Sequence, residues 1–135
     1  MLRNIFQPRP AMPAAGARSV AHSAALSNAL SNALSVAELK QRLDDGEQLH
    51  VIDVRSAAEF AHDGRIAAAR LLPLPVLAER MSELPHDVPI VCVCRSGQRS
   101  GLAAEMLARH GFTNALNLTG GMQAWARAGL PTQRG

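Results

Sequence analysis

The chain has 135 residues, a length typical of one domain, and 47% of them are hydrophobic against 19% charged, so most of it can form a packed core. The net charge of +3 arises in the first 35 residues, which hold three of the 14 basic residues and no acid, so the remaining 11 basic residues face all 11 acidic ones. Without a basic excess in the remainder, and with one Trp, three Phe and no Tyr, the chain lacks a nucleic-acid-binding signature. No apolar stretch approaches the roughly 18 residues of a membrane span. We therefore expect neither nucleic acid nor a membrane as a partner.

Residues 1–34 are expected to form a disordered or partly helical extension, followed by a domain over residues 35–135. Prolines and scattered arginines in residues 1–22 disfavour packed structure. The Arg-rich, acid-free composition resembles a mitochondrial targeting segment, but a disordered extension or a wrongly assigned start codon explains it as well and is preferred. Over residues 23–35, leucines at a spacing of four predict one stripe of a frayed helix.

From Ser35 onward, helix and strand signals alternate. Two capping-box patterns, Ser35 with Glu38 and Ser56 with Glu59, each predict the start of a helix. Short apolar runs rich in branched residues predict buried strands between the helices. The expected helices span 36–43, 57–62, 75–83, 100–110 and 121–128, and the expected strands span 49–54, 70–72, 89–94 and 114–118.

This alternation predicts an α/β fold with a central, mainly parallel sheet of four to five strands and helices on both faces. Ligands of such sheets bind beyond the carboxyl ends of the strands. We therefore expect the functional site in the segments that follow Val54 and Val93.

The two cysteines, Cys92 and Cys94, are separated by one residue in an expected strand, where a disulfide between them would be strained. A reducing, cytoplasmic location is therefore expected. Cys92 is interpreted as a small buried residue of the strand, and a resolving thiol is the alternative.

Residues 94–100 read Cys-Arg-Ser-Gly-Gln-Arg-Ser, between an expected strand and an expected helix. Glycine permits a tight turn with positive φ, so the backbone amides can form an anion-binding nest at the helix N-terminus. The two arginines add positive charge, and the final serine can cap the helix or donate its hydroxyl into the pocket. Such surroundings favour a thiolate. We expect Cys94 to be the nucleophile, with an anion-binding loop formed by Arg95, Ser96, Gly97, Gln98, Arg99 and Ser100.

Residues 94–100 resemble the active-site loop of single-domain rhodaneses. Val51–Arg55, followed by Glu59 and Phe60, is similar to the family's first strand and the acidic-aromatic pair after it. The family's closing segment resembles Gly120–Met122 with Ala124–Trp125 and Ala128–Pro131. The resemblance runs from about Ser35 to Pro131 and implies a single rhodanese-like domain.

The resemblance implies a thiosulfate sulfurtransferase with a ping-pong covalent cycle. Cys94 would take the outer sulfur of thiosulfate, or of a similar small anionic donor, and pass it from a persulfide to cyanide or a thiol. No metal or organic cofactor is implied, and the five histidines show no ligand spacing. Arg55 would bind the anionic donor or pair with Asp53 or Glu59, and Asp53 is interpreted as a supporting partner.

One departure from the family pattern lies at Gly64-Arg65-Ile66, where the family commonly has Gly-His-Ile. The following Ala67–Ala69 stands where the family has Pro-Gly-Ala. Arg65 either packs and hydrogen-bonds as the histidine would, or adds charge near the pocket.

Two other functions remain as alternatives. The domain could be a persulfide carrier or interaction module that is fed by a protein donor and passes sulfur to a protein acceptor. A cysteine-based phosphatase or arsenate reductase is less favoured, because phosphatase loops resemble Cys-x5-Arg whereas Cys94 and Arg99 form Cys-x4-Arg.

Overall fold

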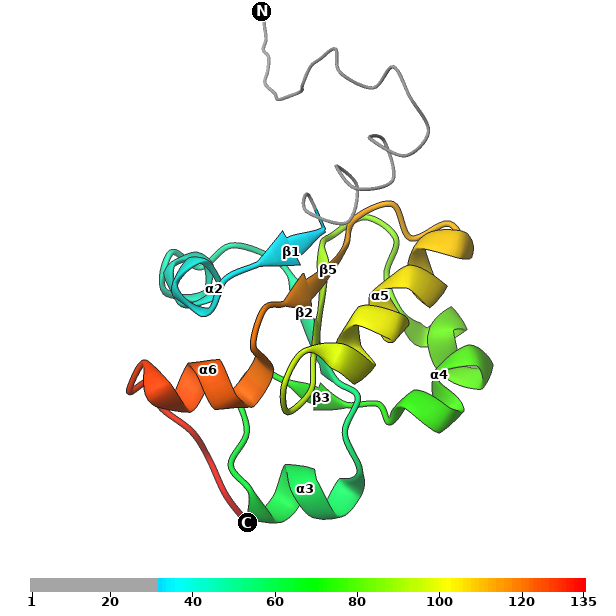
Figure 1. Ribbon diagram of the computed structural model, residues 1–135. Coiled ribbons are helices and arrows are strands. Elements are labelled where there is room, and N and C mark those ends of the chain that lie inside the picture. The colour runs from blue at the N-terminus through cyan, green and yellow to red at the C-terminus, as the bar shows by residue number, and fades with distance from the viewer. Residues whose placement is uncertain (1–31) are drawn as a thin grey trace, which may run out of the picture. The chain divides into compact units, whose positions relative to one another are not determined.

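A five-stranded sheet forms the centre of the part of the chain that the structure, a computed structural model, describes: residues 32–135. All strand pairs are parallel, and the strand order is β1-β5-β4-β2-β3 (Figure 1). This confirms the expected α/β fold and parallel sheet. The strands are β1 (Ala33–Leu34), β2 (His50–Asp53), β3 (Arg70–Leu71), β4 (Ile90–Val93) and β5 (Ala115–Leu118).

Helices cover both faces of the sheet. On one face lie α4 (Leu74–Arg80), the short 3-10 helix η2 (Met81–Glu83) and α5 (Gln98–Arg109). On the other lie α2 (Val36–Asp44) and α6 (Gly121–Arg127), while α3 (Ala57–His62) follows β2 (Figure 1). Within residues 32–135, no helix is long and apolar enough to cross a bilayer.

The side chains of β4 alternate between the two hydrophobic cores. Val91 and Val93 join the core beneath α2 and α6. Ile90 and Cys92 join the core beneath α4 and α5, and Cys94, one residue beyond the strand, continues the alternation on that side. Because successive side chains of a strand point to opposite faces, this register directs Cys94 toward α5.

The local start signals agree with the structure. Both capping boxes are present: the Ser35 and Ser56 side chains each accept a hydrogen bond from the amide three residues on, and Glu38 and Glu59 accept from the cap amides. The helix predicted over 100–110 begins earlier, at Gln98, because Gly97 with φ of 103° already turns the chain into the helix. The stretch 75–83 divides into α4 and η2.

The helix predicted over residues 23–35 is wrong for Ala33 and Leu34, which form β1. The amide of Asn117 donates to the Asn32 carbonyl at 2.7 Å, and that of Thr119 donates to the Leu34 carbonyl at 2.8 Å. Residues 33–34 thus pair with the outer edge of β5, and burial of the Leu34 side chain beneath α2 and α6 stabilises this pairing. The sheet begins two residues before Ser35. The other leucines of the stripe, and the targeting prediction, lie outside the described residues.

Candidate active site

The thiol of Cys94 lies at the carboxyl end of β4, on the first residue after the strand, and the residue is only 1% exposed. Its Sγ accepts hydrogen bonds from the backbone amides of Gly97 at 3.1 Å and of Ser100 at 3.3 Å. The Ser100 hydroxyl oxygen lies 3.2 Å from the same sulfur. The chain thus wraps the sulfur in hydrogen-bond donors at the N-terminus of α5.

Burial of Cys94 favours the neutral thiol and by itself would raise its pKa. The hydroxyl and amide of Ser100, together with the amides of Gly97 and Ser96, outweigh that effect and hold the pKa of Cys94 below its ordinary value. The loop therefore favours the thiolate, which is the nucleophilic form of a cysteine.

The N-terminus of α6 holds the other side of the loop. The amide of Met122 donates to the Cys94 carbonyl at 2.8 Å, and that of Gln123 donates to the Arg95 carbonyl at 2.9 Å. In a trans peptide the N–H points opposite to the C=O, so these contacts turn the amides of Arg95 and Ser96 away from α6. The closing segment of the sequence therefore also orients the loop.

Arg55 is buried in an ion pair with Asp53, one of the two roles that the sequence left open for it. Its Nε donates to Asp53 Oδ1 at 2.9 Å, and its Nη2 donates to Asp53 Oδ2 at 2.8 Å and to the Gly64 carbonyl at 2.9 Å. The pair joins the end of β2 to the loop that follows α3. Glu59, the other expected carboxylate, pairs elsewhere.

Arg99 of α5 forms a two-pronged ion pair with Glu59 of α3, at 2.8 Å and 2.9 Å. The guanidinium is the main reason that the pKa of Glu59 falls to about 2, and the carboxylate in turn raises the pKa of Arg99. Much of the positive charge expected of Arg99 at the loop is thus compensated. The pair fastens α3 to the start of α5.

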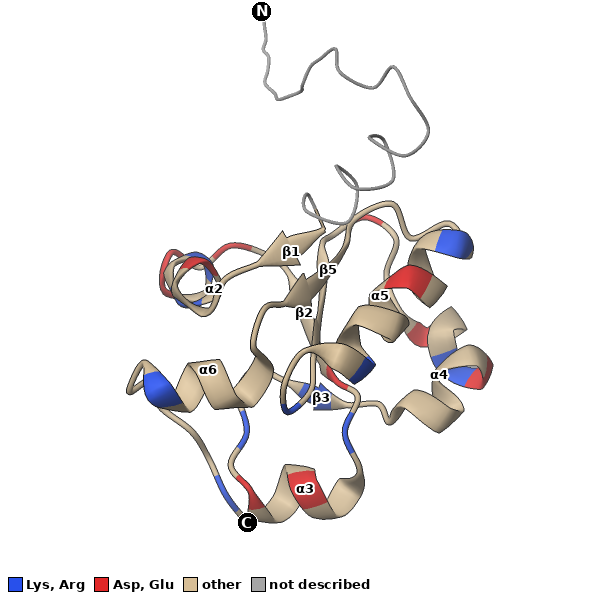
Figure 2. Cartoon of the chain, in the orientation of Figure 1, with Lys and Arg blue, Asp and Glu red and all other residues tan. Residues whose placement is uncertain are grey.

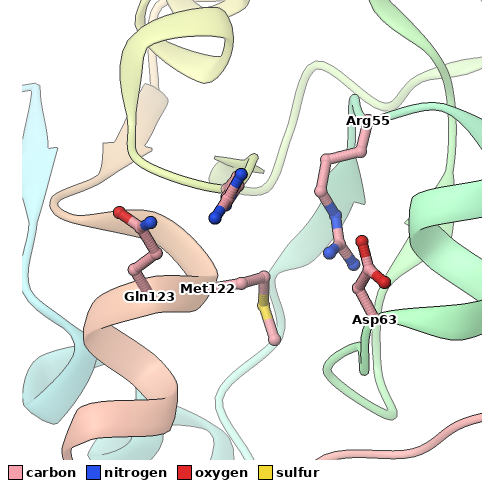
Figure 3. A pocket seen from close by; sticks show the side chains of 5 residues that line it. Arg55, Asp63, Met122 and Gln123 are labelled. Atoms are coloured by element: carbon pink, nitrogen blue, oxygen red, sulfur yellow. The ribbon is translucent and has the colours of Figure 1, made fainter.

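A pocket of about 360 Å³ borders the Cys94 loop. Arg55 and Asp63 lie on one side of it and Met122 and Gln123 on the other (Figure 3). Arg95 also lines the pocket, is exposed, and has no carboxylate partner among residues 32–135. Basic positions lie after β2 and along the loop into α5, with acidic positions on α3 (Figure 2). Arg95 is therefore the basic side chain of the pocket that no carboxylate among residues 32–135 compensates, while Asp63 is an acidic side chain of the pocket that is likewise outside every ion pair of these residues.

The remaining predicted loop residues, Ser96 and Gln98, are exposed. The amide of Ser96 helps to lower the pKa of Cys94, whereas Gln98 is the first residue of α5. Ser100 lies inside α5 rather than at its cap, so its hydroxyl takes the second expected role, facing the thiol.

Of the two roles expected for Arg65, the structure shows the one in which the side chain packs and hydrogen-bonds. Its guanidinium lies 4.8 Å from the centre of the Phe60 ring and donates to the carbonyls of Phe60 and Gly135, each at 3.2 Å. Its backbone pairs with Gln133 in an isolated antiparallel bridge. Arg65 thus ties the segment after α3 to residues 133–135.

Asn117 of β5 is a residue of the site that the sequence analysis missed. Its Nδ2 donates to the Gly97 carbonyl at 3.0 Å, and its Oδ1 accepts from the Ser100 hydroxyl at 2.6 Å. The available signal was a single polar side chain in the otherwise apolar run Ala115–Leu118. Its partners became visible only when β5 and the start of α5 were placed side by side.

Cys92 is fully buried, and burial, with a smaller contribution from Cys94, raises its pKa to about 12. A thiol of this kind stays protonated and shielded, which suits the small core residue and not the resolving thiol. In residues 32–135, no three side chains of His, Cys, Asp or Glu gather in a way that would hold a metal ion.

The fold and the site define an α/β domain with a buried cysteine of lowered pKa at the carboxyl edge of a parallel sheet. The chain belongs to the Rhodanese-like domain family, whose profile matches residues 35–128.

The relatives agree with this membership. A protein named sulfurtransferase from Allochromatium vinosum is 47% identical over 93 residues, which are 69% of this chain and 86% of that protein. A putative sulfur carrier protein, YrkF of Bacillus subtilis, is 34% identical over 86 residues, but the match spans 64% of this chain and only 46% of YrkF. Among solved structures, a rhodanese-related protein from Thermoplasma volcanium superposes with a TM-score of 0.69 at 29% identity, covering 76% of this chain and 97% of that one.

Proposed function

We propose that this protein is a sulfurtransferase that moves a sulfane sulfur from thiosulfate, or a similar small anionic donor, to cyanide or a thiol through a Cys94 persulfide. The observation that carries the proposal is the thiol of Cys94, with its lowered pKa, held by the amides of Gly97 and Ser100 beside a pocket that Arg95 lines. The relative named sulfurtransferase supports the same chemistry.

In the first half of the cycle, the Cys94 thiolate attacks the outer sulfur of thiosulfate. A bond forms between Sγ and that sulfur, the bond to the sulfonate sulfur breaks, and its electron pair leaves with sulfite. The negative charge of the thiolate moves to the outer sulfur of the persulfide. Amides that stabilise a thiolate can also stabilise this anion.

In the second half, an acceptor attacks the outer sulfur and the electron pair of the S–S bond returns to Sγ. Cyanide takes up the sulfur and becomes thiocyanate, and an acceptor thiolate becomes a persulfide. This ping-pong cycle uses only the thiol, the amides and the charges of the chain, so it requires neither a metal nor an organic cofactor. Both cysteines are free thiols, which suits a reducing compartment such as the cytoplasm.

Arg95 is the residue best suited to bind the sulfonate of the donor, because it lines the pocket and has no carboxylate partner in the described chain. Arg55 contributes to the wall of the same pocket, with its orientation fixed by Asp53. Arg99 holds the loop through Glu59 and acts on the donor mainly at a distance.

The second candidate is a persulfide carrier that receives sulfur from a protein donor. The relative named a putative sulfur carrier favours it, and the same Cys94 site would serve both functions. A phosphatase is less suited, because Arg99 is one residue nearer to Cys94 than in Cys-x5-Arg loops and is paired with Glu59.

The test is the intact mass of the purified chain after incubation with thiosulfate, followed by cyanide. We expect a gain of one sulfur atom that cyanide removes as thiocyanate, and no gain in Cys94→Ser. Cys92→Ser is the matched control and should still gain the sulfur. Loading from a persulfidated protein but not from thiosulfate would favour the carrier, and no loading from either would overturn both candidates.

A further inference from the structure

The hydroxyl of Ser100 lies between two acceptors. Its Oγ is 3.2 Å from Cys94 Sγ and 2.6 Å from Asn117 Oδ1. A serine hydroxyl carries one proton and can donate it to only one of them at a time. Ser100 is fully buried and Cys94 is only 1% exposed, so bulk water does not readily replace a donor to the sulfur, whereas Asn117 is half-buried.

The side-chain amide of Asn117 has one favourable orientation. Its Nδ2 donates to the Gly97 carbonyl at 3.0 Å, which leaves Oδ1 toward Ser100. The reversed amide would place Oδ1 against the Gly97 carbonyl, two acceptors without a proton between them. Asn117 therefore presents an acceptor to Ser100 in a fixed position.

We propose that Asn117 is a positioning residue that competes with Cys94 for the hydroxyl proton of Ser100 and thereby favours the sulfur-loaded form of the site over the free thiolate. This inference rests on the proposed persulfide cycle. It assigns to β5 a role in holding the sulfur, in addition to the loop that surrounds it.

The competition follows from where the negative charge lies. In the free thiolate the charge is on Sγ, and a hydrogen bond to a charged acceptor is stronger than one to an amide, so the hydroxyl turns to the sulfur. Asn117 Oδ1 then loses its donor in a half-buried position, which costs free energy. In the persulfide the charge is on the outer sulfur and Sγ is neutral, so the hydroxyl returns to Asn117. Only the O–H bond rotates, and no proton leaves the site.

The charged groups around Cys94 come from several elements. Arg99 of α5 is paired with Glu59 of α3, and Asp53 of β2 is paired with Arg55. Arg95 follows in the loop, and Asp63 lines the pocket just after α3. Cys92 of β4 is neutral because its pKa is raised, and α6 contributes the uncharged Met122 and Gln123. None of these groups is itself substituted in the Asn117 and Ser100 variants.

The experiment is a double-variant comparison with Asn117→Leu, which is close in size to Asn and accepts no hydrogen bond. The Cys94 pKa is measured from the pH dependence of iodoacetamide alkylation in wild type, Asn117→Leu, Ser100→Ala and the double variant. The hydrogen bond to the Gly97 carbonyl is lost in both variants that carry Asn117→Leu, so its effect cancels between the two backgrounds. The difference that remains reports the competition for the Ser100 proton alone.

We expect Asn117→Leu to shift the Cys94 pKa about 0.5–1 unit further downward when Ser100 is present than in the Ser100→Ala background, the size of one ordinary hydrogen bond. Equal shifts in the two backgrounds, or the opposite sign, would overturn the proposal and leave Asn117 as a support for the Gly97 turn. Asn117→Ala, tested in the same way, replaces Asn117→Leu if the larger side chain prevents folding.

The persulfide supplies a second readout. In Asn117→Leu the loaded sulfur should pass to cyanide about three- to tenfold faster than in wild type, and Ser100→Ala should remove that difference. If wild type cannot be loaded at all, the proposed function fails, whereas the pKa comparison still decides the role of Asn117.

Discussion

Gly121 lies against the carbonyl oxygen of Cys94 so closely that a Cβ atom on this glycine would be 2.3 Å from it and 2.7 Å from the carbonyl oxygen of Arg95. Both contacts involve backbone, which cannot move without moving the loop that holds the thiol. Gly121 also has a φ of 56°, which side-chain-bearing residues adopt at a cost. The closing segment thus packs directly against the peptide group of Cys94, with no room for a side chain between them.

Gly121→Ala should therefore lower the free energy of unfolding by about 2–4 kcal/mol, measured by urea titration, because backbone strain and a backbone clash add. Gly129→Ala is the matched control, since Gly129 has a φ of 73° but a Cβ atom on it would meet nothing within 4 Å. Its loss should be only about 1 kcal/mol. Equal losses in the two variants would mean that the contact with Cys94 contributes nothing.

Glu59→Gln should destabilise the protein at neutral pH by about 1 kcal/mol, a value reduced for the partial exposure of the Arg99 pair. The pKa of Glu59 is lowered to about 2 in the folded state, so its contribution is fully present above the unfolded pKa, near 4.3, and disappears as the pH falls toward 2. Urea midpoints of wild type and Glu59→Gln should therefore converge below pH 4.

Glu47→Gln provides the comparison for Glu59. Glu47 pairs with Arg42 at 3.3 Å, and both side chains are well exposed. Its replacement should change the stability by less than about 0.5 kcal/mol at any pH. A pH-independent deficit in Glu59→Gln would show that lost helix capping, and not the ion pair with Arg99, explains its effect.

From the burial of His50 we expect a second pH dependence of the stability, separate from that of Glu59. Its Nε2 is buried and has no hydrogen-bond partner within the described chain, and burial, together with the charge of Arg70, lowers the pKa of His50. The unfolded chain takes up the proton near pH 6.5, before the folded one does, so stability should fall as the pH drops below that value. In thermal melts between pH 7.5 and 5, His50→Leu should lack this component, and parallel curves for the two proteins would contradict the prediction.

Arg95→Gln should raise the KM for thiosulfate by about three- to tenfold, the range expected for one exposed charge, while leaving the urea midpoint unchanged. An uncharged sulfur donor should be used almost as well as by wild type. Arg127→Gln, at the far end of α6, is a control that keeps the same change in net charge. If Arg95→Gln impaired both donors alike, the residue would shape the loop and not bind the sulfonate.

Local signals were sufficient for the features that depend on neighbours in sequence. The apolar run of β4, both capping boxes and the turn at Gly97 could be predicted because their partners lie within a few residues. Hence the position of Cys94 at the mouth of the sheet followed from the sequence as well.

Features that depend on distant partners could not be predicted in the same way. β1 has two residues and exists because the edge of β5 is open, which no pattern around Ala33 encodes. Arg99 finds Glu59 forty residues away, and Asn117 finds Ser100 only after β5 and α5 are adjacent. Charge and polarity identified these side chains as notable, but the pairings belong to the tertiary structure.

Because side chains alternate along β4, the face of the sheet on which the thiol lies and the groups that surround the thiol are determined by different parts of the chain. Cys94 lies on the same face of the sheet as Ile90 and Cys92 because it is four and two residues beyond them. Inserting or deleting one residue in the strand would therefore move its sulfur to the face covered by α2 and α6. The hydrogen-bond donors to the thiol come after the strand ends, from Gly97 and Ser100. An engineer could therefore exchange the loop of residues 95–100 for one of different length or charge and keep the thiol on its original side of the sheet.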